Sequence, residues 1–282
     1  MSDHTDVRTI DLGSHSTRVA IAGEALVAGD RSAEPVFLCL HGLVDDLSIW
    51  DRIAGELAER GTVVRYDQRG HGAAGSPPGP YSRDDLAADA VAVLAALDID
   101  RAVLVGHSMG GIMSMTTAVN HPDRVAGLVL IGTTSAANAK AAAWYSKIAQ
   151  AGVDDGIDGL AETIYGTGRQ REIRGDAVGI AEVTRTLEAL HTDPLTPHLA
   201  HVGCPALLLV GEHDPMGVKA TAIVADAIAD STVEFVDGVG HWVHVQRPDA
   251  MLAAYDNWAS DHLGNDIHDI PDTPATEETM RP

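Results

Sequence analysis

Short apolar runs alternate with helical segments along most of the chain, and this rhythm constrains the fold more than any other feature. The runs are continuous, bounded by glycine or polar residues, and typical of strands buried on both faces. They include PVFLCLHG, AVLVG, VAGLVLIG and PALLLVG. Between them, segments such as 81–99 and 109–120 carry apolar residues at helical spacing. Strands and helices in alternation predict an α/β fold with a mostly parallel central sheet flanked by helices.

The alternation is interrupted once. Residues 133–201 contain alanine-rich, helix-like segments without a convincing strand. We therefore expect residues 1–132 and 202–264 to form one α/β core, and residues 133–201 to form a helical cap inserted into it. Residues 265–282 are rich in proline, threonine and acidic residues, so we expect a disordered tail there.

The sequence Gly-His-Ser-Met-Gly, residues 106–110, has the glycine-x-serine-x-glycine pattern of a nucleophile elbow. Alone the pattern is weak, because an isolated serine of this kind can equally be a helix cap. Its context is more specific: a predicted strand precedes Ser108 and a predicted helix follows it. A sharp strand-to-helix turn exposes the serine hydroxyl above the sheet, so we predict Ser108 to be a nucleophile.

A serine nucleophile needs a base, and the base needs an orienting acid. Asp214 follows the run PALLLV, and His241 follows the run STVEFV. The chain order Ser108, Asp214, His241 is the one expected when each residue ends its own strand of such a sheet. We predict these three residues to be a catalytic triad.

Two alternatives exist for the acid and one for the base. Glu212 and Asp237 lie close to the predicted acid in the sequence, and His244 lies three residues after the predicted base. We favour Asp214 as the acid, and expect His244 to pack or to face solvent.

Several motifs together resemble the α/β-hydrolase superfamily, over roughly residues 19–263 apart from the insertion. They are His41-Gly42, Asp67–Gly72, the elbow with Gly111, His121–Val125, Gly211–Pro215 and Gly240–Trp242. Within the superfamily the chain is most similar to small carboxylesterases and lactonases such as 3-oxoadipate enol-lactonase. The resemblance implies that the backbone N–H groups of Leu43 and Met109 form the oxyanion hole.

Other residues are candidates for substrate contact. His107 and Trp242 adjoin the nucleophile and the base, although His107 is more typical of a supporting residue. Trp144 and Tyr145 lie in the predicted cap, where aromatic residues serve packing as often as binding. We expect His41 and His71 to hold loops by hydrogen bonds.

A basic cluster in the cap also has two interpretations. It comprises Arg169, Gln170, Arg171 and Arg174. These residues could bind a substrate carboxylate, but we favour a solvated helix face.

The formal net charge of −22 argues against nucleic-acid and anionic membrane partners, which attract clustered Lys and Arg. No apolar run approaches the ~18 residues of a membrane span, and the start MSDHTDVRTI lacks signal-peptide features. We expect a cytoplasmic protein with Cys39 and Cys204 as reduced core thiols. The closest histidine pairs, 198/201 and 241/244, lack carboxylate or cysteine partners, so we expect no metal and no cofactor.

The predicted substrate is a small carboxylic ester or lactone, cleaved through an acyl-enzyme. The same triad also supports carbon–carbon bond hydrolysis and perhydrolysis, and a slow-turnover ligand receptor is a further alternative on this fold. A dehalogenase is disfavoured because the nucleophile position holds Ser108 and not an aspartate. The oligomeric state stays open between monomer and homodimer.

Overall fold

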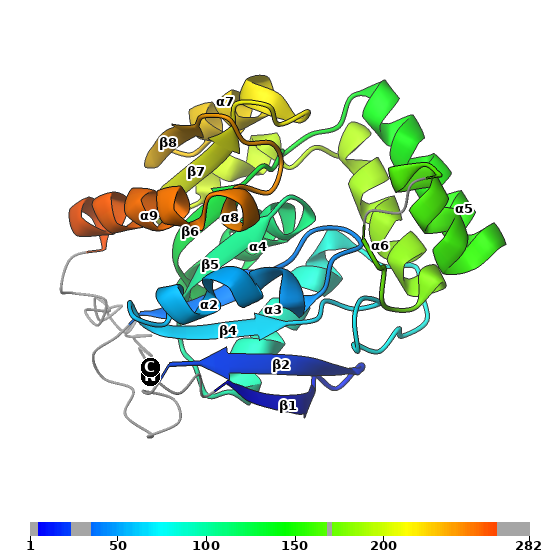
Figure 1. Ribbon diagram of the computed structural model, residues 1–282, viewed down its shortest axis with the longest axis horizontal. Helices are drawn as coiled ribbons and strands as arrows, with labels where there is room; N and C mark the ends of the chain where they lie inside the picture. Colours follow the sequence, from blue (N-terminus) through cyan, green and yellow to red (C-terminus); the bar gives the residue numbers. More distant parts are fainter. Residues whose placement is uncertain (1–4, 24–34, 168–170, 264–282) are drawn as a thin grey trace, which may run out of the picture.

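The computed structural model describes residues 5–23, 35–167 and 171–263 (Figure 1). The tail predicted at residues 265–282 lies outside them. Eight strands form one sheet in the order β1-β2-β4-β3-β5-β6-β7-β8. The strands are β1 (Asp6–Asp11), β2 (Ser16–Ala22), β3 (Val36–Leu40), β4 (Thr62–Tyr66), β5 (Ala102–His107), β6 (Val125–Ile131), β7 (Ala206–Gly211) and β8 (Ser231–Val236). The pairs β1/β2 and β2/β4 are antiparallel and all other pairs are parallel, which confirms the predicted fold class.

Each central strand contributes to two apolar cores, one on each face of the sheet. In β3, Leu38 and Leu40 belong to one core, whereas Phe37 and Cys39 belong to the other. This division follows from the period of two along a strand, and because both faces are buried the strand sequence is apolar throughout.

Helices cover both faces (Figure 1). One core includes residues of α3 (Arg83–Ala96), α4 (Met109–Asn120) and α7 (Gly217–Ala227). The other includes residues of α2 (Asp51–Leu57), α8 (Val243–Gln246) and α9 (Pro248–His262), and the 3-10 helix η1 (Leu47–Trp50) packs with them. A second short 3-10 helix, η2 (Pro122–Arg124), precedes β6. Among the described residues, no helix combines the length and the apolar character that a membrane crossing requires.

Helices also fill the chain between β6 and β7. They are α5 (Ala139–Tyr165), α6 (Ala177–Glu188), η3 (Ala189–His191) and η4 (Thr196–His201). Helices α5 and α6 pack together beside the core (Figure 1) and bury Ile148, Leu160 and Ile180. Gly156, with φ 68°, interrupts α5. Because this stretch has no strand among its described residues, it is an addition to the sheet and not a part of it.

The strand order places the ends of two strands at a reversal. The chain leaves β3 towards β4, on one side, and leaves β5 towards β6, on the other. Loops that diverge in this way open a crevice at the carboxyl ends of the strands, where open α/β sheets bind ligands. In this chain the loop after β3 and the elbow after β5 lie on the two sides of the reversal.

Candidate active site

Ser108 occupies a strained turn between β5 and α4. Its backbone has φ 52° and ψ −113°, a conformation that residues other than glycine rarely adopt. Its N–H donates to the carbonyl of Ile131 at 2.8 Å. Its side chain makes no capping hydrogen bond to α4, so the structure does not support the alternative in which Ser108 is a helix cap. The turn is the geometry that a nucleophile elbow requires.

The two glycines of the motif allow the close approach of three elements. A Cβ atom on Gly106 would lie 2.5 Å from the carbonyl oxygen of Gly110, and one on Gly110 would lie 2.0 Å from that of Leu40. Neither position can hold a larger residue without moving backbone. The start of α4 is thereby pressed against the end of β3, and Met109 is brought towards the loop that carries Leu43.

Asp214 and His241 form a direct pair. The Nδ1 atom of His241 lies 3.0 Å and 3.1 Å from the two carboxylate oxygens of Asp214. The Asp214 side chain is fully buried and also accepts a hydrogen bond from the N–H of Met216 at 2.9 Å. Because an ionised carboxylate only accepts, Nδ1 of His241 carries the proton and Nε2 is left as an acceptor.

The rival acids lie elsewhere. Glu212 is more than half exposed and accepts from the N–H of Gly238 at 2.9 Å, and Asp237 is exposed. His244, the rival base, is fully buried between Trp50 and His107, with ring centroids 4.5 Å and 4.6 Å away. Burial lowers the pKa of His244 to about 3. The geometry therefore favours Asp214 and His241 over their sequence neighbours.

The residues that follow β6 connect the nucleophile to this pair. Thr133 donates its hydroxyl hydrogen to the carbonyl of Ser108 at 2.7 Å. A Cβ atom on the preceding Gly132 would lie 2.6 Å from the Asp214 carboxylate and 3.0 Å from Nδ1 of His241. Ser108 and the Asp214–His241 pair therefore contact the same short segment. The three residues predicted from strand ends meet at one place.

Hydrogen bonds of histidine side chains hold the loops around the predicted oxyanion hole. Within the loop after β3, Nδ1 of His41 is 2.8 Å from the carbonyl of Gly42, and Nε2 of His41 accepts from the N–H of Gln68 at 2.9 Å. His71 likewise bonds the carbonyl of Arg69 at 3.0 Å, which confirms that both histidines hold loops. Met109 is the first residue of α4, where a backbone N–H has no partner inside the helix. These features suit the Leu43 and Met109 amides to the oxyanion role.

Comparison with known proteins agrees with this geometry. Residues 35–165 match the family described as alpha/beta hydrolase fold. The 2-(acetamidomethylene)succinate hydrolase of Mesorhizobium japonicum is 28% identical over 91% of this chain and 96% of its own length. The 3-oxoadipate enol-lactonase 2 of Acinetobacter baylyi is 29% identical over 78% and 87%. The putative non-heme haloperoxidase of Mycobacterium phage D29 is 30% identical over 81% of this chain and 89% of its own length. The chain belongs to the α/β-hydrolase family.

A solved structure supports the same fold for this α/β-hydrolase. The enol-lactonase from Burkholderia xenovorans superposes with a TM-score of 0.79 and 24% identity, over 90% of this chain and all of the other. The resemblance inferred from the motifs is confirmed, and the protein is a hydrolase.

Two arginines of the predicted basic cluster do not lie on a helix, contrary to expectation. Arg171 and Arg174 lie in non-helical chain between α5 and α6, so the interpretation as a solvated helix face is wrong for them. Arg171 donates to Asp45 at 3.0 Å, and its guanidinium lies 5.4 Å from the ring centroid of Trp242. Arg174 pairs with Glu172. Positions 169 and 170 lie outside the described residues.

Asp45 is the polar residue of the site that sequence reasoning missed. Its side chain is only 9% exposed, and its carboxylate lies 3.8 Å from Nδ1 of His107. His107 is buried, its Nε2 lies 3.1 Å from the carbonyl of His241, and burial holds its pKa well below the ordinary value. His107 is therefore a neutral supporting residue. The one signal for Asp45 was an acidic pair, with Asp46, in the loop that carries Leu43.

The two cap aromatics differ in burial. Tyr145 is 9% exposed and packs into the core, whereas Trp144 is 44% exposed. Their ring centroids are 5.3 Å apart. Within the described residues neither makes a ring contact or hydrogen bond with the predicted triad. The geometry supports packing for Tyr145, and substrate contact by Trp144 stays a prediction.

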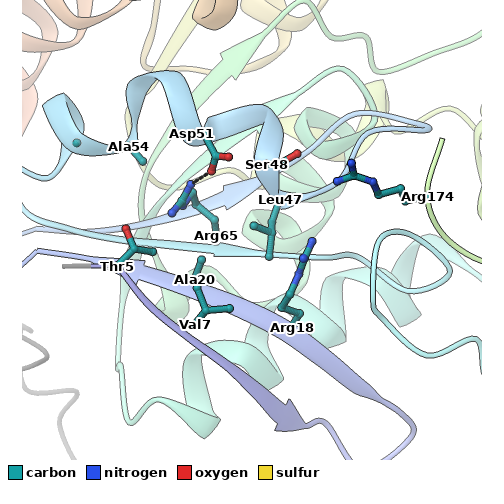
Figure 2. A pocket seen from close by; sticks show the side chains of 11 residues that line it. Thr5, Val7, Arg18, Ala20, Leu47, Ser48, Asp51, Ala54, Arg65 and Arg174 are labelled. Atoms are coloured by element: carbon teal, nitrogen blue, oxygen red, sulfur yellow. Dashed lines mark hydrogen bonds and ion pairs between the residues drawn. The ribbon is translucent and has the colours of Figure 1, made fainter. Parts of the chain in front are cut away.

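A cleft of about 440 Å³ has none of the three predicted triad residues in its lining (Figure 2). It is lined by residues of β1, β2, β4, η1 and α2 together with Arg174.

Among the described residues, no group of three or more His, Cys, Asp or Glu side chains could hold a metal ion. Cys39 and Cys204 are free and buried, and burial raises their thiol pKa values to about 12 and about 11.

Proposed function

We propose that this hydrolase cleaves a small carboxylic ester or lactone through a Ser108 acyl-enzyme. The observation that carries the proposal is the Asp214–His241 hydrogen bond beside a serine held at positive φ. The enol-lactonase name of one relative supports a lactone or ester as the substrate class.

Acylation begins when Ser108 Oγ attacks the acyl carbon. Nε2 of His241 accepts the hydroxyl proton, while Asp214 keeps the ring in the required tautomer and stabilises the imidazolium. The tetrahedral oxyanion is held by the Leu43 and Met109 amides, one of which adds the partial positive charge of the α4 N-terminus. His241 then protonates the departing alkoxide, and the acyl–serine ester remains.

Deacylation repeats these roles with water as the nucleophile. His241 takes a proton from water, the hydroxide attacks the acyl carbon, and Ser108 leaves with the proton from His241. For a lactone the departing alkoxide stays on the acyl chain, so one ring-opened hydroxy acid is released. In this proposal the helices between β6 and β7 act as the cap, which limits water entry and shapes the substrate site.

Ser108→Ala tests the mechanism, and Ser114→Ala is its matched control. Ser114 lies on α4, is fully buried, and donates to the carbonyl of Gly110, so it cannot act as nucleophile. On p-nitrophenyl esters and a panel of lactones, Ser108→Ala should lower kcat by about 10³-fold or more. A fluorophosphonate probe should label Ser108 in the wild type and in the Ser114 variant. Near-normal turnover by Ser108→Ala would refute the proposal.

A further inference from the structure

A buried carboxylate lies beneath the backbone that leads to Leu43. A Cβ atom on Gly42 would lie 3.1 Å from the Asp45 carboxylate and 2.8 Å from Nδ1 of His107. Such a group needs a charged partner, because removal from water is costly for an unpaired ion. Burial raises the pKa of Asp45, and the Arg171 guanidinium is the strongest influence that lowers it.

Among the described residues, Arg171 is the one arginine or lysine in ion-pair distance of Asp45. It approaches from the segment between α5 and α6, and 126 positions separate the two residues. Three histidines also face this carboxylate: His41 and His241 lower the pKa of Asp45, and Nδ1 of His107 lies 3.8 Å from it. The Arg171 side chain thus connects the segment between α5 and α6 to the buried carboxylate of the loop after β3.

The same guanidinium also contacts the loop after β8. It lies over the ring of Trp242, at 5.4 Å from the centroid, and that ring meets the His241 ring edge-on at 5.3 Å. Contact of a guanidinium with an indole face is attractive, and more so where both are partly shielded from water. Arg171 is about one-third exposed, so its pairing is partly shielded.

We propose that Arg171 is a positioning residue: by pairing with Asp45 and covering Trp242 it fixes the Leu43 loop and the His241 loop relative to each other. The reaction on which it acts is the one proposed above. Misplacement of catalytic groups by about 1 Å can lower the rate by 10²-fold. The rate should therefore depend strongly on Arg171, which contacts both loops. Loss of Arg171 also removes the guanidinium that pairs with the buried Asp45 carboxylate.

Arg171→Gln is the central variant and Arg174→Gln its matched control. Arg174 comes from the same segment and pairs with Glu172 and with Asp46, but it is half exposed and lines the cleft of Figure 2. Arg171→Gln should lower kcat on a neutral ester about 10- to 100-fold with little change in KM. Arg174→Gln should leave both within about twofold. Arg171→Lys should restore part of kcat, because it keeps the charge but not the planar contact with Trp242.

Asp45→Asn completes a double-mutant cycle. If the two residues act as a pair, the double variant should lose no more kcat than the worse single variant. A substrate-binding role for Arg171 would instead raise KM, and only for esters that carry a carboxylate. That result, or additive losses in the cycle, would overturn the positioning role.

Hydrogen exchange separates this inference from the proposed function. Arg171→Gln should speed amide exchange several-fold in residues 42–46 and in 241–245, and Arg174→Gln should not. This readout needs no turnover. Unchanged exchange in both loops would overturn the inference even in an active esterase. Faster exchange in a protein that lacks esterase activity and fluorophosphonate labelling would refute only the proposed function.

Discussion

Two regions of the molecule are held in place by different interactions. One comprises the loops at the ends of β5, β7 and β8, and the other comprises the helices between β6 and β7. Ser108 and Asp214 are positioned by backbone hydrogen bonds at the ends of fully buried strands. The added helices α5 and α6 bury apolar side chains largely against each other, and Arg171 reaches the site through a side chain. Backbone hydrogen bonds at strand ends fix the positions of catalytic side chains closely. Substitutions in the added helices should disturb the sheet less.

The largest effect should come from the acid at the end of β7. Asp214→Asn keeps the size of the side chain but removes the acceptor for the Nδ1 proton of His241, so kcat should fall by about 10³- to 10⁴-fold. Glu212→Gln and Asp237→Asn, which change exposed carboxylates nearby, should stay within about threefold. Steady-state kinetics on one ester decide the point. A crippled Asp237→Asn enzyme would move the acid role to β8 and end the assignment of Asp214.

Two glycines at positive φ provide the next comparison. Gly132 has φ 53° and touches the Asp214–His241 pair, whereas Gly156 has φ 68° and open space around it. Alanine at either position costs about 1–2 kcal/mol of backbone strain. Only Gly132→Ala should also displace His241, so its kcat should fall about 10- to 100-fold. Gly156→Ala should lower Tm and keep kcat.

Melting temperature and kcat are to be measured on the same preparations of both glycine variants. Equal losses of kcat would mean that the helices between β6 and β7 position the triad as strictly as the sheet does. A lower Tm in both variants, with a loss of kcat in Gly132→Ala alone, is the expected pattern.

The difference between the two regions also explains what the sequence could reveal. The positions of Ser108, Asp214 and His241 can be predicted from the sequence, because each residue follows a strand and parallel strands end at one edge of the sheet. The Asp45–Arg171 ion pair cannot be predicted in this way. It joins residues from two irregular segments, and the distance between these segments depends on how α5 and α6 pack. The same limit made the helix face predicted for Arg171 and Arg174 wrong.

Trp144 and Tyr145 show an intermediate case. Neighbouring residues on a helix point in directions about 100° apart, so one of two adjacent aromatics is expected to face outward. The buried positions Ala142, Tyr145, Ile148 and Ala149 follow the helical period and assign Tyr145 to the packed face. Helical periodicity therefore settles burial, but it does not show what the exposed Trp144 contacts.

The smallest effects should come from this pair. Tyr145→Ala removes a buried aromatic side chain and should lower Tm by roughly 5–10 °C, with the ranking of substrates unchanged. Trp144→Ala changes a side chain that is 44% exposed, so its Tm should stay within about 2 °C. If Trp144 lines the route to Ser108, its removal should change kcat/KM for long acyl esters relative to short ones by a few-fold, because a larger apolar surface then loses its partner. Melting curves and kcat/KM for acetate through octanoate esters, taken on the same samples, separate the two roles. If the substrate ranking of the Trp144 variant is unchanged, Trp144 does not contact the acyl chain. Substrate selection would then depend on other residues of the cap and core, and Trp144 would only be an exposed neighbour of the packed Tyr145.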